Sequence, residues 1–177
     1  GNHNTVVGDE AGTAVTTGIE NTLIGSEAGD ALTDADRNVA VGHDALGGDT
    51  LGSNSVAIGY NVLKLQNFTT ATNTYNTAVG HNAGASVTTG IQNTLIGGLA
   101  GDALTDADNN IAIGYNALSS DTLGTASIAI GESALLAQNF TTATNAYNVA
   151  IGTGAGAGIS TGISNTIVGG LAGDALT

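Results

Sequence analysis

The chain of 177 residues has no cysteine, proline, methionine or tryptophan, and its only basic residues are Arg37 and Lys64. Without cysteine the chain forms no disulfides and no thiolate metal sites. With so few Lys and Arg side chains to neutralise phosphates, we expect it to bind neither nucleic acid nor an anionic membrane surface. It also has no run of 18 apolar residues and no signal-peptide pattern, so we expect no membrane insertion of this segment.

Glycine is abundant, and the few charged side chains are mostly acidic. Fifteen acidic side chains give a net charge of −13, and 28 glycines interrupt the chain every few residues. An uninterrupted helix of about 10–12 residues is therefore not expected. The apolar runs are short and β-branched and have turn-forming residues on both sides, which is typical of short strands. Because Val, Ile and Leu recur in phase, the composition does not indicate disorder.

A five-residue frame recurs along the whole chain. Each copy has Asn or Ser, then Thr, Val or Ile, then a small or aliphatic residue, then Val or Ile, then Gly. The ten copies begin at Asn4, Asn21, Asn38, Ser55, Asn76, Asn93, Asn110, Ser127, Asn148 and Asn165. Successive copies start 17 residues apart, except for two intervals of 21, and residues 8–79 align with residues 80–151 as a super-repeat of 72.

This period is too short for a pair of helices, which needs about 33 residues or more. It predicts an all-β fold, a parallel β-solenoid or β-roll, with about ten stacked coils of 17 or 21 residues. Residues 1–177 are then a single repeat array. Because neither end shows a polar capping repeat, we expect the array to be a segment of a longer fibre.

Strand alternation predicts which side chains face the core. We count the Asn or Ser of each frame as position one of its coil. Position four is Val or Ile in all ten copies, so positions two and four are predicted to face inward and position three outward. Position three is apolar too, as at Ala57, Ala78 and Ala129. An apolar outward stripe predicts a homo-oligomer, several chains associating through the position-three face.

Stacking also predicts columns of identical side chains. Coils ~4.8 Å apart place equivalent residues directly above one another. The Asn residues at position one, and the Thr, Asn and Ser residues at position thirteen, are predicted to form hydrogen-bonded ladders. Position five is Gly in every coil, which predicts either a positive φ or a close approach by another backbone.

The two longer coils carry their four extra residues within 68–75 and 140–147. Insertions in a solenoid form loops on one side. The aromatic residues of these loops are candidate contacts for a ligand such as a glycan: Phe68, Tyr75, Phe140 and Tyr147. The alternative is that these rings pack back over the edge of the coil and hold the loop in place.

Acidic side chains cluster on one loop of each super-repeat. The candidate calcium ligands are Asp30, Asp34, Asp36, Asp102, Asp106 and Asp108. Calcium prefers several carboxylate and carbonyl oxygens, but these loops lack the Gly-Gly-x-Gly-x-Asp motif of calcium-binding β-rolls. The alternative is a solvated acidic surface that keeps a fibre soluble. Calcium is the one cofactor that the sequence raises.

No catalytic site is expected, because the acidic residues lie on repeated loops and the chain lacks a distinctive cluster of catalytic groups. His3, His43 and His81 stand in different contexts without paired spacing, so we expect no histidine metal site. Ice binding through the Thr column at position thirteen is a further alternative.

Several frames resemble known families. Ser55-Val-Ala-Ile-Gly59 and Ser127-Ile-Ala-Ile-Gly131 resemble the head repeats of YadA-like trimeric autotransporter adhesins. Asn76-Thr-Ala-Val-Gly80 and residues 110–118 also resemble repeats of phage tail-fibre proteins. The resemblance extends over essentially the whole chain. It implies a left-handed parallel β-roll that is trimeric about the fibre axis and serves surface attachment.

The sequence thus predicts a structural or adhesive segment of an extracellular fibre without enzymatic activity. We expect a homotrimeric shaft of a bacterial surface adhesin, a phage tail fibre or an extracellular filament, located at a cell surface or on a virion. A host receptor or a glycan is the expected partner. The alternative function is a glycan- or calcium-binding module that uses the insertion loops or the acidic turns.

Overall fold

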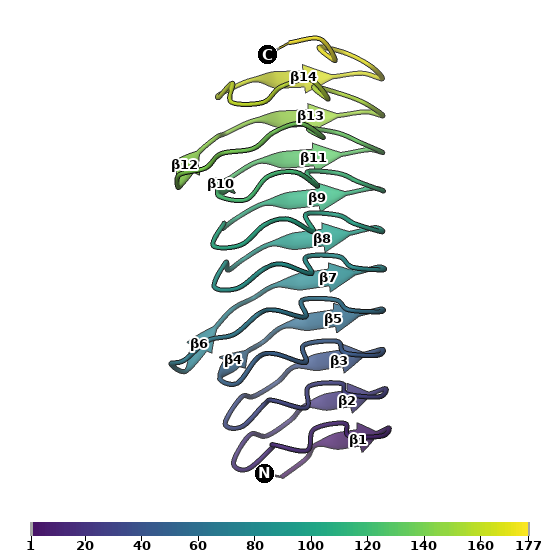
Figure 1. Ribbon diagram of the computed structural model, residues 1–177, viewed down its shortest axis with the longest axis vertical. Coiled ribbons are helices and arrows are strands. Elements are labelled where there is room, and N and C mark those ends of the chain that lie inside the picture. The colour runs from purple at the N-terminus through teal and green to yellow at the C-terminus, as the bar shows by residue number, and fades with distance from the viewer. Residues whose placement is uncertain (1, 177) are drawn as a thin grey trace.

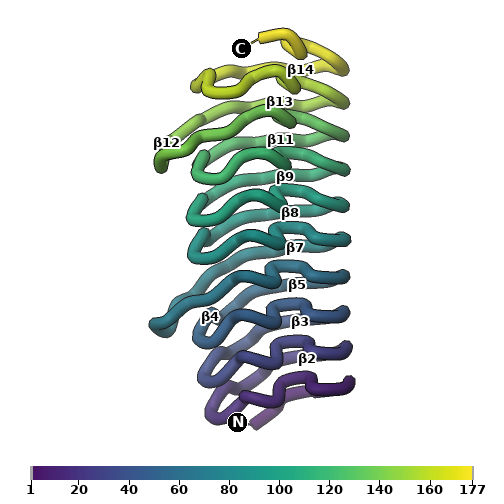
Figure 2. Tube along the Cα trace, in the orientation of Figure 1, coloured from purple at the N-terminus to yellow at the C-terminus, as the bar shows by residue number. Residues whose placement is uncertain are grey.

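The computed structural model describes residues 2–176, and none of them lies in a helix. The chain winds into a parallel β-solenoid whose termini lie at opposite ends of the rod (Figure 1). Figure 2 shows that the coils follow nearly the same path, except where two of them, one at β12, extend farther to one side. The predicted fold class, a parallel β-solenoid with one coil per frame, is confirmed.

One strand from each coil joins a single sheet of ten parallel strands. These strands are β1 (Thr5–Val7), β2 (Thr22–Ile24), β3 (Val39–Val41), β5 (Val56–Ile58), β7 (Thr77–Val79), β8 (Thr94–Ile96), β9 (Ile111–Ile113), β11 (Ile128–Ile130), β13 (Val149–Ile151) and β14 (Thr166–Val168). Equivalent frame positions pair, for example Ala57 with Ala78 across the 21-residue coil. The register follows the frame and is unaffected by the insertion.

Two further sheets have two parallel strands each and lie beside the insertions. They pair β4 (Gly52–Ser53) with β6 (Thr72–Asn73), and β10 (Gly124–Thr125) with β12 (Thr144–Asn145). In Figure 1 the β6 and β12 segments extend beyond the edge formed by the other coils. The insertions therefore project on one side, as predicted.

The predicted orientation of the strands is wrong. Position three faces the core, and its side chain is 0% exposed in the eight internal coils, including Ala57, Ala78 and Ala129. Position four faces outward, and Ile24, for example, is 38% exposed. The position-three face is therefore closed off inside each chain and is not available for contacts between chains.

The narrow coil explains this orientation, because its interior accepts a large side chain from only one side at a time. Leu23 at position three lies opposite Gly29 at position nine, where an added Cβ would come within 2.8 Å of Leu23 Cδ2. In the next coil the sizes are exchanged, and Ala40 is combined with Leu46, both fully buried. A column of Val or Ile at position three would not fit without a matching loss of volume elsewhere.

The Asn ladder at position one is confirmed. Asn21 is typical of it: its Oδ1 accepts the backbone N–H of Asn38 in the next coil at 2.9 Å. Its Nδ2 donates to the carbonyl of Ala35, near the end of its own coil, at 2.7 Å. The side chain is 1% exposed. One buried amide thus holds together the two ends of a coil and also fixes the register of the next coil.

The ladder at position thirteen is confirmed in a modified form. Thr16 and Thr33 donate from Oγ1 to the backbone carbonyls of the next coil, at 3.3 and 3.1 Å. Thr50 donates to Asn67 Oδ1 at 3.0 Å, which is the side-chain contact that the sequence predicts. Thr177, the last residue of this column, lies outside the described residues.

Both predicted roles of the glycine at position five are realised. Gly97 has φ +133°, and a Cβ added to it would lie 2.5 Å from the carbonyl oxygen of Gly114 in the next coil. A real Cβ does not approach a carbonyl oxygen this closely, and L side chains rarely adopt this φ. Any residue other than glycine would therefore separate the coils.

We predict that Gly97→Ala lowers the free energy of unfolding by about 2–4 kcal/mol, because it combines backbone strain with a steric clash between coils. The neighbouring Gly98→Ala is the matched control, since its added Cβ would meet only the Tyr115 ring at 3.4 Å. Denaturant unfolding of both variants measures the difference. Equal effects of the two substitutions would contradict the proposed role of position five.

Candidate functional site

The outward face of the ten-stranded sheet repeats one side-chain pattern along the rod. It consists of positions two and four, which hold Thr, Val or Ile at every coil and no charged residue. Ile58, Ile96 and Ile151 are 38–39% exposed on it. We call these two columns the outer sheet face. β-Branched side chains in register on a parallel sheet give an even, apolar surface.

The two 21-residue coils contain a buried polar network that the sequence analysis did not identify. Gln66 Nε2 donates to Asp49 Oδ2 at 2.6 Å and to Ser55 Oγ at 3.0 Å, and Gln66 Oε1 accepts from Asn76 Nδ2 at 2.8 Å. The second copy joins Gln138 to Asp121, Ser127 and Asn148 at the same distances. Asp49 and Gln66 are 0% exposed. The sequence signal was position twelve, where Asp and Gln replace the Val, Leu or Ile of the other coils.

This network holds the insertion loops. Asp49 Oδ1 accepts the backbone N–H groups of Gly52 and Phe68, at 3.0 and 3.2 Å. Phe68 itself is only 7% exposed, and its carbonyl accepts from Thr50 Oγ1 at 2.8 Å. The start of the insertion is therefore fixed by a buried carboxylate and a buried ring.

The four aromatic candidates of the loops divide into two pairs. Phe68 and Phe140 pack over the coil, as the packing alternative predicts, and are 7% and 6% exposed. Tyr75 and Tyr147 are 56% and 57% exposed. Only the two tyrosines are therefore accessible to a ligand.

The candidate calcium ligands contribute to contacts between coils. Asp34 Oδ1 accepts from Thr17 Oγ1 at 2.6 Å, and Asp36 Oδ1 accepts the backbone N–H of Ile19 at 2.9 Å. Asp106 and Asp108 make the same contacts with Thr89 and Ile91. Burial raises the pKa of Asp30 and that of Asp102. The structure thus gives four of these carboxylates hydrogen-bond partners in the neighbouring coil, and calcium binding by the six remains a prediction.

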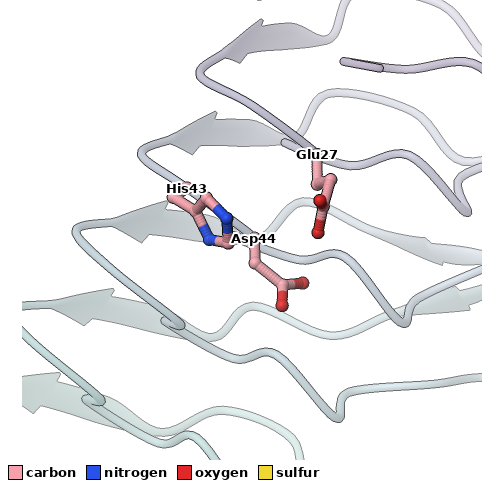
Figure 3. A group of neighbouring side chains, drawn as sticks. All are labelled: Glu27, His43 and Asp44. Atoms are coloured by element: carbon pink, nitrogen blue, oxygen red, sulfur yellow. The ribbon is translucent and has the colours of Figure 1, made fainter. Parts of the chain in front are cut away.

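A different group of residues has the spacing of metal ligands. Glu27, His43 and Asp44 each place one ligand atom within 4.8 Å of the others, and no other group within residues 2–176 does so. Figure 3 shows Glu27 on one turn and His43 with Asp44 on the next. Sequence reasoning did not predict this site, because it compared the histidines only with one another. The signal was the coil period, since Glu27 and Asp44 are 17 residues apart.

Within residues 2–176 the surface has no pocket. That part of the chain also contains no helix of the length and hydrophobicity that a bilayer-spanning segment needs.

A comparison of the chain with protein-family models, curated proteins and solved structures finds no match. The fold itself defines the class, which is a parallel β-solenoid repeat protein.

We predict that Gln66→Leu destabilises the protein by about 3 kcal/mol or more, because it leaves Asp49, Ser55 and Asn76 with unsatisfied polar atoms in a buried place. Thermal and denaturant unfolding measure the loss. Gln92→Leu is the control, since Gln92 is exposed and its replacement is expected to change stability by less than about 0.5 kcal/mol. A loss below about 1 kcal/mol for Gln66→Leu would contradict the structural role of the network.

Burial raises the pKa of Asp49 above its ordinary value of 3.8, against the smaller lowering effect of its hydrogen bonds. The folded chain then holds this proton more tightly than the unfolded chain does. The free energy of unfolding therefore decreases as pH rises from the ordinary pKa through the raised one. We predict a higher thermal midpoint at pH about 4.5 than at pH 7, and a smaller difference in Asp49→Asn. A midpoint that falls on this acidification would contradict the prediction.

Proposed function

We propose that this chain is a shaft segment of an extracellular fibre in which several copies associate through the outer sheet face. The observation that carries the proposal is the composition of that face, which is uncharged over ten successive strands and has Val or Ile at every position four and Thr, Val or Ile at every position two. The rest of the chain is strongly acidic, with a net charge of −13. A mainly apolar stripe that continues along the whole length of a rod is a candidate interaction site.

A second copy of the same chain suits this face better than an unrelated partner. The face repeats at ~4.8 Å along the rod, and another copy presents the same side chains at the same spacing. Because neither face carries charge, bringing two copies together desolvates no ionic group. The trimer in particular is supported by the resemblance to adhesin head repeats.

The size of the face indicates how the strength of association depends on length. Ten strands at ~4.8 Å give a face about 45 Å long and, at about 10 Å width, on the order of 450 Å². A stable interface buries about 800 Å² on each partner. Ten coils alone therefore provide a weak contact with each neighbouring copy, and each added coil strengthens it.

Two features favour a location outside the cell. The stability of a chain without cysteine does not depend on the redox state of its surroundings. The acidic side chains keep an elongated rod soluble. We therefore place the shaft on a bacterial surface, on a virion or in an extracellular filament, without enzymatic activity.

Glycan binding is the second candidate function, and the exposure of Tyr75 and Tyr147 favours it. Both rings lie on insertion loops, at 56% and 57% exposure, and they are 72 residues apart. Aromatic rings exposed on loops offer apolar platforms with a polar tip. The ice-binding alternative receives less support, because Thr16, Thr33 and Thr50 at position thirteen donate their hydroxyl hydrogens to the next coil.

We predict concentration-dependent self-association of the chain, measured by sedimentation or native mass spectrometry. Ile58→Lys combined with Ile96→Lys is expected to weaken it at least about tenfold, because two charges would be buried without partners. Leu65→Lys is the control, since Leu65 is 53% exposed and does not belong to the outer sheet face. A monomer at every concentration would rule out association through this face.

A further inference from the structure

The turns that follow β2 and β3 bring an imidazole and two carboxylates together. The backbone N–H of Glu27 donates to the carbonyl of Asp9, and that of Asp44 donates to the carbonyl of Ser26. Glu27 and Asp44 thus occupy the same position in successive coils, and His43 precedes Asp44 directly. One ligand atom from each side chain lies within 4.8 Å of the other two (Figure 3).

We propose that Glu27, His43 and Asp44 bind one divalent transition-metal ion of the zinc class, which cross-links the second and third coils. Imidazole nitrogen suits zinc, copper, iron and nickel, whereas calcium prefers six to eight oxygens. Three protein ligands leave one position of a tetrahedral site open to water.

The distances permit this coordination after small side-chain movements. In a tetrahedral site with metal–ligand bonds of about 2.0–2.1 Å, ligand atoms lie about 3.3 Å apart. The three atoms therefore have to approach by at most about 1.5 Å from their present separations. Glu27 is only half-buried, and its long side chain has room to move toward His43 and Asp44.

The charges around the site favour a cation. Asp30 is a third carboxylate near it. Both Asp44 and Asp30 lie beside Gly47, because a Cβ added to that glycine would be 2.0 Å from Asp44 Oδ1 and 3.3 Å from Asp30 Oδ1. Lys64 is the one basic residue at the cluster, and its Nζ lies 2.6 Å from Asp44 Oδ2. A single ammonium group faces three carboxylates, so Lys64 both offsets part of the negative charge and competes with a metal ion for Asp44.

The ring of His43 lies at one end of a stack of three rings, which restricts its tilt. Its ring lies 5.3 Å from that of Tyr60, which lies 5.4 Å from the ring of His81. A ring held in one plane loses less conformational freedom when its nitrogen binds a metal.

The second super-repeat provides an internal comparison. At 72 residues further on, the equivalents of the four cluster residues Glu27, His43, Asp44 and Lys64 are Leu99, Tyr115, Asn116 and Leu136. The buried apolar residues of the second and third coils are unchanged in their equivalents, for example Leu46 and Leu118. The three proposed ligands and their competing lysine are therefore present together in one copy and absent together in the other.

Calorimetric titration with zinc chloride tests the proposal. The wild-type chain is expected to bind one equivalent, and the triple variant Glu27→Leu, His43→Tyr and Asp44→Asn is expected to bind at least tenfold more weakly. These replacements are the residues of the second super-repeat, which forms the same coils. Lys64→Leu is expected to tighten binding at least threefold, because it removes the competing cation. His3→Ala is the control and is expected to leave the affinity unchanged.

Two further measurements make the test independent of any one variant. Zinc is expected to raise the thermal midpoint of the wild-type chain and not that of the single variant His43→Tyr, because the ion binds only the folded arrangement. With cobalt(II) added in place of zinc, the absorption spectrum of the bound ion is expected to show that nitrogen is one of its ligands. Equal zinc binding by wild type and triple variant, no binding at millimolar zinc, or binding of calcium in place of zinc would each overturn the proposal.

Discussion

The stack depends on the buried amide at position one of the coil. Through its Oδ1 each Asn before the last coil accepts the backbone N–H of the equivalent residue in the next coil, and through its Nδ2 it donates toward the end of its own coil, as Asn93 does at 2.9 and 2.7 Å. In a dry interior, an amide that lost either partner would carry the cost of an unsatisfied polar group. The contact therefore closes each coil and fixes the register between coils at the same time.

The longer coils show how the structure maintains this constraint when Asn is replaced. Ser55 has no amide, and in its place Thr74 Oγ1 accepts the backbone N–H of Asn76 at 3.4 Å, while Gln66 Oε1 accepts from the side-chain Nδ2 of Asn76 at 2.8 Å. The same Gln also donates to Asp49 in the preceding coil. Three successive coils thus share one polar network.

The interior and the edges of the rod have separate roles. The interior repeats with little change, since it must satisfy the same backbone contacts in every coil. The turns after the strands also make backbone contacts between coils, but these contacts do not depend on the side chains of positions six and seven, and there the two super-repeats differ: His43 becomes Tyr115 and Asp44 becomes Asn116. Chemistry specific to one copy is therefore expected at the turns, and association common to all coils on the outer sheet face.

The sequence by itself determined that the chain forms stacked coils, because a period of 17 with Gly at position five and Asn at position one is satisfied by identical coils stacked in register. It did not determine which side of the strand faces inward, since alternation separates two faces without saying which is enclosed. The closed coil decided this, because its interior has room for Ala57 and not for a column of Val and Ile. Only the tertiary structure also placed Phe68 inside and Tyr75 outside, and brought Glu27 to His43, since these relations depend on how one coil lies against the next.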